Sequence, residues 1–595
     1  GYQRNNNGRS RGRGRSHRGR FVSRGRENNS RSWGEGRVTH EPPPPSSSVG
    51  SVLRIAVQGC CHGQLDQIYQ TIQAEELRTG DKVDLLLCCG DFQSLRNIAD
   101  LASMAVPDKY KEIGTFYKYY SGQVVAPVLT VFIGGNHEAS VPLQELFYGG
   151  WVAENIYYLG CAGVVNFGGL RIAGISGIYK EHDYKLGHYE RPPYDRGTLR
   201  SVYHVRNVEV YRLQQLKRGD EDSNIDIMLS HDWPRGIEQF GDTQALLRKK
   251  QFFRSEVETN TLGSPAGEIL LHSLKPKRWF AGHLHVKFEA TVHYPPRAKS
   301  SSPMPTSWDN ITGWEATTTI EAGDGERDYQ KTSETPDTIS PSTHFFGLES
   351  SAGCCENASS NLTQQMTKFL ALDKCLPQRN FLQIVTMKRP ESEVEKEPEL
   401  KYDLDWLIIL RKTAHLTVAS KSFVKVPNSP LEITQQDVYE ILQKFSKLDN
   451  CDPTLPSSYD LRIPRNFEIT VSPHQEGFSP FSQQRPSPMI GNPQTDHFLN
   501  MLDLQHVVTV PYRPNPQVQR GREADIMQET SSEMRCVVAD RDLLERDDNE
   551  IELDEDEGLD DDIANDGTGL PSEEIFDGDE ILLDDDNIST DDIPE

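Results

Sequence analysis

Residues 83–93, Val-Asp-Leu-Leu-Leu-Cys-Cys-Gly-Asp-Phe-Gln, contain the pattern that decides the fold, a short apolar run that ends in polar residues. Such a run is typical of a buried strand. Six runs of this kind predict strands at Leu53–Val57, Val83–Cys89, Val128–Ile133, Leu170–Ile175, Ile225–Leu229 and Arg278–Ala281. A helix-spaced apolar face at Leu65, Ile68, Tyr69 and Ile72 follows the first run. The alternation of such patterns from Ser51 to Ala290 predicts an α/β domain.

Polar clusters stand directly after all but one of these predicted strands. They are Cys60–His62, Gly90-Asp91, Gly135-Asn136-His137-Glu138, Ser230-His231-Asp232 and Gly282-His283-Leu284-His285. Because α/β sheets place their sites at strand ends, we expect these side chains to lie close together.

The clusters supply seven metal donors, namely Cys60, His62, Asp91, Asn136, His231, His283 and His285. A carboxylate such as that of Asp91 can bridge two ions held about 3.5–4 Å apart. Each piece alone has another explanation, because Gly-Asp is common in turns and a single histidine is often structural. A fold that has lost its metal is a further alternative. Five pieces in order favour a site for two metal ions.

The order of these clusters resembles the calcineurin-like phosphoesterases, whose pattern is D-x-H, G-D, G-N-H-E, H and G-H-x-H. The resemblance implies a metallophosphoesterase β-sandwich flanked by helices. Cys60 departs from the general class, since an aspartate normally stands there. A thiolate shifts the metal preference toward zinc or iron, so we expect two divalent ions among Fe²⁺, Zn²⁺ and Mn²⁺. Cys61, Cys88 and Cys89 are expected to fill the sheet interior.

Two such ions would hold the phosphate oxygens and lower the pKa of a shared water. The resemblance implies that His137 is not a ligand but faces the substrate as an acid or electrostatic stabiliser. A role of this kind typically contributes about 10²–10⁴ in rate. We expect Glu138 to orient the site rather than bind metal.

The substrate has to be inferred from residues outside the metal pattern. Residues 92–97, Phe-Gln-Ser-Leu-Arg-Asn, differ from the G-D-x-x-D-R-G of serine/threonine phosphatases, which disfavours that class. Residues 176–206 interleave aromatic and cationic side chains, a mixture that suits unpaired bases and phosphates. The candidate substrate-binding residues are Tyr179, Lys180, Tyr184, His188, Tyr189, Tyr203, His204 and Arg206. An ordinary polar insertion is the alternative.

Longer motifs resemble the RNA lariat debranching family nearly without gaps over residues 52–290. They include Gly59–Gly63, Cys88–Gln93, Gly135–Ser140, Tyr203–Asn207, Ser230–Pro234, Asn260–Pro265 and Ala281–Phe288. The same family has the cysteine found at Cys60. The resemblance implies hydrolysis of the 2′,5′-phosphodiester bond at the branch point of excised intron lariats, with a linear intron as product. It also implies a lariat recognition loop at residues 176–206 and a further C-terminal domain.

Composition divides the chain into five predicted parts. Residues 1–50 form a disordered Arg/Gly/Ser-rich arm, with eleven Arg against three Glu. Residues 51–292 form the catalytic domain, and residues 293–367 a low-complexity linker or insertion. Residues 368–450 form a small C-terminal domain or a cap on the first. Residues 451–595 form a disordered tail, Pro-rich and then acidic.

Charge and cysteine usage restrict the partners. The segment from Asp540 to Glu595 has 26 acidic residues against two arginines and so carries nearly all of the net charge of −26. It would repel nucleic acid, and either binds basic partners or serves only as a solubilising end. The basic arm suits weak RNA binding or is a plain linker. No disulfide framework, zinc CxxC pair or apolar run long enough to span a membrane is present, so we expect a reducing compartment.

We therefore expect branched intron RNA as the partner, no membrane association and a nuclear location, with shuttling to the cytoplasm as an alternative. Two rivals stay open. One is a general dimetal phosphodiesterase or nuclease of the same class, and the other is a noncatalytic RNA-binding scaffold. The oligomeric state does not follow from the sequence.

Overall fold

A computed structural model of the chain describes residues 39–40, 50–216, 224–295, 365–446, 459–475 and 488–513. Two seven-stranded sheets form its centre. The first has the order β1 (Thr39–His40), β13 (Leu382–Lys388), β2 (Val52–Gln58), β3 (Leu85–Cys88), β4 (Thr130–Phe132), β6 (Ile156–Tyr158) and β5 (Gly150–Ala153). The second has the order β11 (Phe288–His293), β12 (Met366–Ala371), β10 (Arg278–Ala281), β9 (Ile227–Ser230), β8 (Leu170–Ile175), β7 (Ala162–Phe167) and β14 (Leu400–Tyr402).

The middle strands of each sheet are parallel. This holds for β2, β3, β4 and β6 in the first sheet and for β8, β9, β10 and β12 in the second. The carboxyl ends of these strands therefore share an edge within each sheet, and the predicted polar clusters follow five of them. In the first sheet β13 runs antiparallel to β2 and parallel to β1, and β5 runs antiparallel to β6. In the second sheet β11 runs antiparallel to β12, and β7 runs antiparallel to β8.

Alternating side chains of the strands build separate apolar layers, because successive residues of a strand point to opposite faces. Leu85 and Leu87 of β3 share one buried cluster with Ile227 and Leu229 of β9, which is the core between the two sheets. Leu86 of β3 faces the other way, into a cluster with α1 (Leu65–Thr79) and α2 (Phe116–Tyr120).

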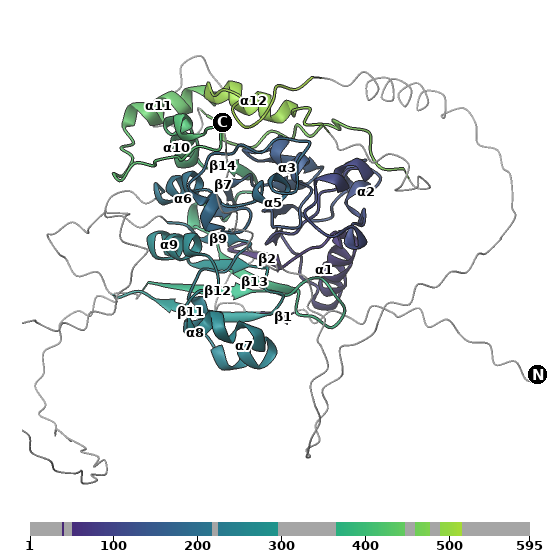
Figure 1. The fold of residues 1–595 in the computed structure, drawn as a ribbon. Coiled ribbons are helices and arrows are strands. Elements are labelled where there is room, and N and C mark those ends of the chain that lie inside the picture. Colours follow the sequence, from purple (N-terminus) through teal and green to yellow (C-terminus); the bar gives the residue numbers. More distant parts are fainter. Residues whose placement is uncertain are drawn as a thin grey trace, which may run out of the picture. The chain divides into compact units, whose positions relative to one another are not determined.

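The outer face of the second sheet is covered in the same way. Met228 of β9 packs with residues of α6 (Asn207–Gln214), α9 (Pro265–Leu274) and α10 (Leu404–Lys412). The architecture is thus a β-sandwich flanked by helices, as predicted (Figure 1). The remaining α-helices are α3 (Ser140–Glu145), α4 (Glu181–Tyr184), α5 (Thr198–Ser201), α7 (Thr243–Lys249), α8 (Arg254–Glu258), α11 (Gln435–Lys444) and α12 (Pro493–Leu502).

The segment predicted as a separate domain at residues 368–450 begins inside the catalytic sandwich. Strand β12 lies between β10 and β11, and β13 pairs with β2 over seven residues. Strand β14 then joins the edge of the second sheet beside β7, and α10 and α11 pack over that sheet. Residues 296–364, most of the predicted linker, lie outside the described residues, and the strands on either side of them, β11 and β12, pair antiparallel.

Part of the predicted disordered tail is ordered, so that prediction was wrong for residues 459–475 and 488–513. Helix α12 has Asn492 as its N-cap and Pro493 at its start, and it buries Phe498 and Leu502 in the same cluster as α10. The Gln494 side chain also exchanges two hydrogen bonds with the backbone of Trp151, both 2.8 Å long. Averaging composition over a long Pro-rich and acidic range hid this short amphipathic helix.

The two arms lie mostly outside the described residues. Residues Thr39–His40 of the predicted N-terminal arm form β1, which pairs with β13. The acidic segment from Asp540 onward is not among the described residues. Among the helices that are described, none combines the length and apolar character needed to cross a membrane.

Candidate metal centre

The loops after five strands carry the predicted metal donors to one place. Cys60 and His62 follow β2, Asp91 follows β3, and Asn136 follows β4. His231 follows β9, while His283 and His285 follow β10. Because the strands that carry the donors are parallel within each sheet, their carboxyl ends point the same way and the loops meet above the sandwich.

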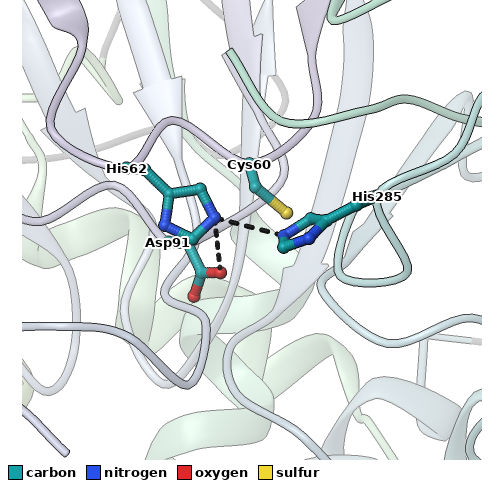
Figure 2. A group of neighbouring side chains, drawn as sticks. All are labelled: Cys60, His62, Asp91 and His285. Atoms are coloured by element: carbon teal, nitrogen blue, oxygen red, sulfur yellow. Dashed lines mark hydrogen bonds and ion pairs between the residues drawn. The ribbon is translucent and has the colours of Figure 1, made fainter. Parts of the chain in front are cut away.

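Asp91 lies at the centre of this group. Its Oδ2 is 3.6 Å from Nε2 of His62, and its Oδ1 is 3.3 Å from Nε2 of His231. Cys60, His62, Asp91 and His285 each offer one ligand atom within 4.8 Å of the others (Figure 2).

The remaining predicted donors complete a second side of the group. Nε2 of His231 is 3.1 Å from Oδ1 of Asn136, and its ring centroid is 4.9 Å from that of His283. The six other predicted donors thus surround Asp91, directly or through one neighbour.

Two of the imidazoles meet through their Nε2 atoms. Nε2 of His62 and Nε2 of His285 are 3.2 Å apart. Burial lowers the pKa of His62 to about 4 and that of His285 to about 2, so both rings are neutral at neutral pH. Neutral imidazole nitrogens brought together beside a carboxylate and a cysteine sulfur are the ligands that zinc and other transition metals prefer. The residues present therefore fit divalent metal ions.

Asp91 and His231 form the charged part of the site. Burial alone would raise the pKa of Asp91, but the nearby His231, His137 and His62 lower it well below its usual range. Burial alone would lower the pKa of His231, but Asp91 and the Cys89 carbonyl raise it to about 9. The carboxylate is ionised at neutral pH and provides the negative charge that attracts cations to this edge.

Glycines allow these groups to approach one another. A Cβ on Gly135 would lie 2.2 Å from Oδ1 of Asp91, and a Cβ on Gly90 would lie 2.3 Å from Nδ1 of His231. His62, Asp91, His283 and His285 all have positive φ, between 45° and 66°. Such φ values are uncommon for residues other than glycine and cluster at functional sites.

A set of hydrogen bonds holds the donors in place. The Nδ1–H of His231 donates to the carbonyl of Cys89 (2.7 Å), which directs Nε2 toward Asp91. Glu138 is buried and accepts from the backbone N–H groups of Phe92, Gln93 and Gly135 at 2.7–3.0 Å. Glu138 therefore ties the Gly-Asp loop to the Gly-Asn-His-Glu loop, in agreement with its predicted orienting role.

Cys60 contributes its sulfur from a fully buried position. Its Sγ accepts a hydrogen bond from the backbone N–H of His283 (2.9 Å). The other three cysteines of the two pairs are also buried, with Cys88 and Cys89 in the clusters on opposite faces of the first sheet. That packing confirms their expected place in the sheet interior. The six cysteines within the described residues are free.

His137 stands beside the ligands without joining their closest group. Its backbone N–H donates to Oδ1 of Asp91 (2.9 Å), while its Nδ1 is 3.8 Å from Oδ2. The side chain is 25% exposed. It is therefore held at the rim, where a substrate can reach it.

Sequence reasoning missed two contributors to the site. Oδ1 of Asp232 is 3.5 Å from Nε2 of His283, and its Oδ2 accepts from the backbone N–H of Tyr179. Lys374 forms a parallel bridge with Cys60. Lys374 carries the same sequence signal as the predicted donors, because Asp373-Lys374 is a polar pair that follows the apolar run of β12.

The predicted recognition segment, residues 176–206, leads away from the strand end of β8 as a packed body. Its two backbone ends lie side by side, since Ile178 and His204 form a parallel bridge. Tyr179 and Tyr184 are half-buried and pack together, with ring centroids 5.2 Å apart. Lys180, Tyr189 and Tyr203 are also partly exposed.

Three of the predicted substrate-binding residues are turned inward. The Arg206 side chain is fully buried and donates to Oε1 of Glu190 (2.6 Å). His188 Nε2 lies 3.2 Å from Oε1 of Glu209, and His204 Nδ1 lies 2.6 Å from Oδ2 of Asp183. Arg206 has no exposed surface with which to bind phosphate, so we correct its role to that of a structural cation.

A cavity lies between this segment and the Gly-Asn-His-Glu loop. Its lining includes Gly135 and Glu138 on one side and His188, Tyr203 and His204 on the other. His204 Nε2 is buried there without a hydrogen-bond partner. The recognition segment thus borders the metal centre directly.

Comparison with known proteins agrees with this geometry. Residues 53–287 match the family model of calcineurin-like phosphoesterases, and residues 364–507 match that of the lariat debranching enzyme C-terminal domain. The chain is 41% identical to the lariat debranching enzyme of Homo sapiens, across 88% of this chain and 84% of that protein. It is 45% identical to lariat debranching enzyme A of Xenopus laevis (76% and 70%) and 42% identical to the Schizosaccharomyces pombe enzyme (76% and 96%).

The helix-flanked sandwich with its histidine, aspartate and asparagine side chains at the strand ends is that of a calcineurin-like phosphoesterase. The two matched regions together span most of the described residues. The chain belongs to the lariat debranching enzyme family.

Proposed function

We propose that this protein hydrolyses the 2′,5′-phosphodiester bond at the branch point of excised intron lariats and so converts them to linear RNA. The observation that carries the proposal is the convergence of Cys60, His62, Asp91 and His285 in a chain of the lariat debranching enzyme family. The relatives from human, frog and fission yeast are all named for this reaction.

We assign two divalent metal ions to the site, chosen among Fe²⁺, Zn²⁺ and Mn²⁺. His62, His285 and Cys60 would hold one of them, while Asn136, His231 and His283 would hold the other, with Asp91 between them. Bound ions of this kind hold phosphate oxygens and generate a nucleophile from water near neutral pH. The soft sulfur of Cys60 favours zinc or iron at its position over harder ions.

His137 acts on the leaving group in this scheme. Its backbone N–H is held by Asp91, and its partly exposed ring lies beside the ligands, with Nδ1 3.8 Å from Oδ2 of Asp91. Protonation or electrostatic stabilisation of the departing 2′ oxygen is the role that fits this position. Glu138 contributes only by holding the two loops together.

The recognition segment distinguishes a branched nucleotide from a linear one. Its partly exposed Tyr179, Lys180, Tyr184, Tyr189 and Tyr203 offer stacking faces and a cation, while its inner residues keep the segment rigid. Since lariats are produced in the nucleus, we also assign a nuclear location to the protein.

Matched substrates test the proposal. A synthetic RNA with one 2′,5′ branch, a linear 3′,5′ RNA of the same composition and the corresponding DNA are incubated with metal-loaded protein. We expect cleavage of the branched RNA alone, at the 2′,5′ bond. Equal cleavage of all three would favour a general phosphodiesterase. Binding without cleavage, and no effect of His137→Ala, would favour a noncatalytic scaffold.

A further inference from the structure

A second surface of mixed cationic and aromatic character borders the metal centre on the side away from the recognition segment. It consists of Arg248, Lys249, Lys250, Phe252 and Arg254, and we refer to it as the α7–α8 ridge. Arg248, Lys249 and Arg254 are exposed, and the Phe252 side chain is 67% exposed. The Nζ of Lys250 is 5.6 Å from the centroid of the Phe252 ring.

The ridge is fixed firmly to the sandwich. Leu246, Leu247 and Phe253 alternate with its exposed residues and are buried in the apolar cluster over the second sheet. The side chain of Asp242 caps α7 by accepting from the N–H of Ala245 (2.9 Å). Phe252 is therefore exposed on a rigid turn, the 3₁₀ segment Gln251–Phe253, rather than on a loose loop.

The fold brings the ridge next to the metal centre. The chain reaches α7 from His231, and Gly241 pairs with Ala290 of β11, so that α7 and α8 lie beside β11 and β12 (Figure 1). Strand β12 leads into Asp373 and Lys374, and Lys374 forms a parallel bridge with Cys60.

Asp373 itself belongs to the wall of the metal centre. A Cβ on Gly59 would lie 2.4 Å from its carbonyl oxygen, which leaves no room between them. The ridge and the loop that carries Cys60 thus both lie beside β12.

The ridge and the recognition segment lie on opposite sides of the metal centre. In the second sheet, β9 and β10 carry His231, His283 and His285. Strand β8, which leads into the recognition segment, borders β9, whereas β12 and β11 border β10. An RNA arm that leaves the branch on the side away from the recognition segment would therefore meet the ridge.

Two simpler explanations account for only parts of the ridge. Cations in the last turn of α7 stabilise the helix by interacting with its dipole, which accounts for Arg248 and Lys249 alone. Single exposed apolar side chains are normal, which explains Phe252 alone. Neither explains why four cations lie within four residues of an exposed ring, with Lys250 over that ring. The acidic Glu256 and Glu258 come only afterwards, along α8.

We propose that the α7–α8 ridge binds a single-stranded flank of the branched RNA, with Phe252 stacking on a base and Arg248 and Lys249 contacting phosphates. The inference rests on the proposed function, since it concerns a substrate with three RNA arms. Aromatic side chains among cations are the usual surface for single-stranded nucleic acid, and they bind it without sequence preference.

A pair of matched double variants tests the ridge. Lys249→Glu/Phe252→Ala alters one cation and one exposed apolar side chain of the ridge. Leu77→Ala/Lys82→Glu likewise alters one exposed apolar side chain and one exposed cation, on α1 and on the loop before β3. These two positions lie at the end of the first sheet away from the metal centre. Each protein is assayed on a minimal branched RNA with two nucleotides per arm and on one with arms of about 20 nucleotides.

We expect the ridge variant to lose about tenfold in affinity and in kcat/KM on the long-armed RNA and less than twofold on the minimal one. The slope of log affinity against log salt should fall by about one for the long-armed RNA, as one phosphate contact is lost. The control variant should match the wild type on both RNAs. Equal loss on both RNAs, or no loss on either, would overturn the inference. Failure of the wild type to cleave the minimal branched RNA would instead overturn the proposed function.

Discussion

The metal centre and the recognition segment border one another, yet their polar residues are used in opposite ways. At the metal centre, polar side chains converge on a common point, and two neutral imidazole nitrogens meet at 3.2 Å. In the recognition segment, several polar side chains instead pair with one another, as Arg206 does with Glu190 and His204 with Asp183. Similar residue types thus form a site in one region and a scaffold in the other.

Backbone geometry explains the difference. A side chain directly after a parallel strand is placed by the sheet, because the register of the strand leaves little freedom to the first residues beyond it. A long segment between elements has to satisfy its own buried polar groups, since an unpaired one costs about 1–3 kcal/mol. Its composition shows which groups are available and not which of them face outward.

Among the substitutions, His137→Ala should have the largest effect on catalysis. We expect kcat on branched RNA to fall by about 10²–10⁴, because an acid or stabilising group near the leaving oxygen is lost. The metal content should stay at the wild-type value, because the His137 side chain is not among the proposed ligands. A parallel loss of metal would place His137 among the ligands instead.

Arg206→Ala tests whether the recognition segment is a scaffold. Its guanidinium is fully buried against Glu190, so its removal should lower the free energy of unfolding by about 3–5 kcal/mol. Urea denaturation measures this loss. Lys180→Ala, at a partly exposed position of the same segment, should cost less than about 1 kcal/mol and should mainly raise KM. If Arg206→Ala left stability unchanged and raised only KM, direct contact with RNA would be its role after all.

Cys60→Ser should weaken metal retention by about tenfold or more, most clearly for zinc or iron, because a hydroxyl replaces a soft sulfur donor. Equilibrium dialysis against a chelator followed by elemental analysis provides the measurement. Serine is nearly isosteric, and Cys60 lies in a loop held by the N–H of His283, so the fold should persist. Unchanged stoichiometry and rate would assign Cys60 to packing.

Removal of the arms should have the smallest effect. A chain that lacks residues 1–38 and 540–595 keeps every element of the sandwich and both sides of the metal centre. Its kcat on a minimal branched RNA should stay within about twofold of the full chain, since weak phosphate contacts at a distance do not act on the reacting bond. A tenfold fall in kcat would show that an arm takes part in catalysis.

Much of the fold was predictable because its strands are short apolar runs with distinct ends. The predicted strands Leu170–Ile175 and Arg278–Ala281 match β8 and β10 residue for residue. Strands β12 and β13 were harder to place, because pairing between β13 and β2 joins residues more than 300 positions apart. No local pattern encodes such a partner, so the sequence predicts only a small C-terminal domain or a cap for these residues.

The residues of the candidate site were likewise predictable where local sequence places them and not where distant contacts do. The donors after β2, β3, β4, β9 and β10 were predictable from type and position, since each follows an apolar run. The inward orientation of Arg206 was not, because it depends on Glu190, whose burial only the folded segment creates. Helix α12 was missed although Asn492 and Pro493 are ordinary signals of a helix start, since the surrounding composition outweighed them.

Reconstitution of metal-free protein shows whether cleavage depends on two bound metal ions. The protein is stripped with a chelator, checked for an unchanged fold by circular dichroism, and then titrated with Fe²⁺, Zn²⁺ or Mn²⁺ while metal content and cleavage of a 2′,5′-branched RNA are followed together. We expect no cleavage without metal and full recovery as two ions per chain are bound. Cleavage at the wild-type rate by protein that holds no metal would contradict the account.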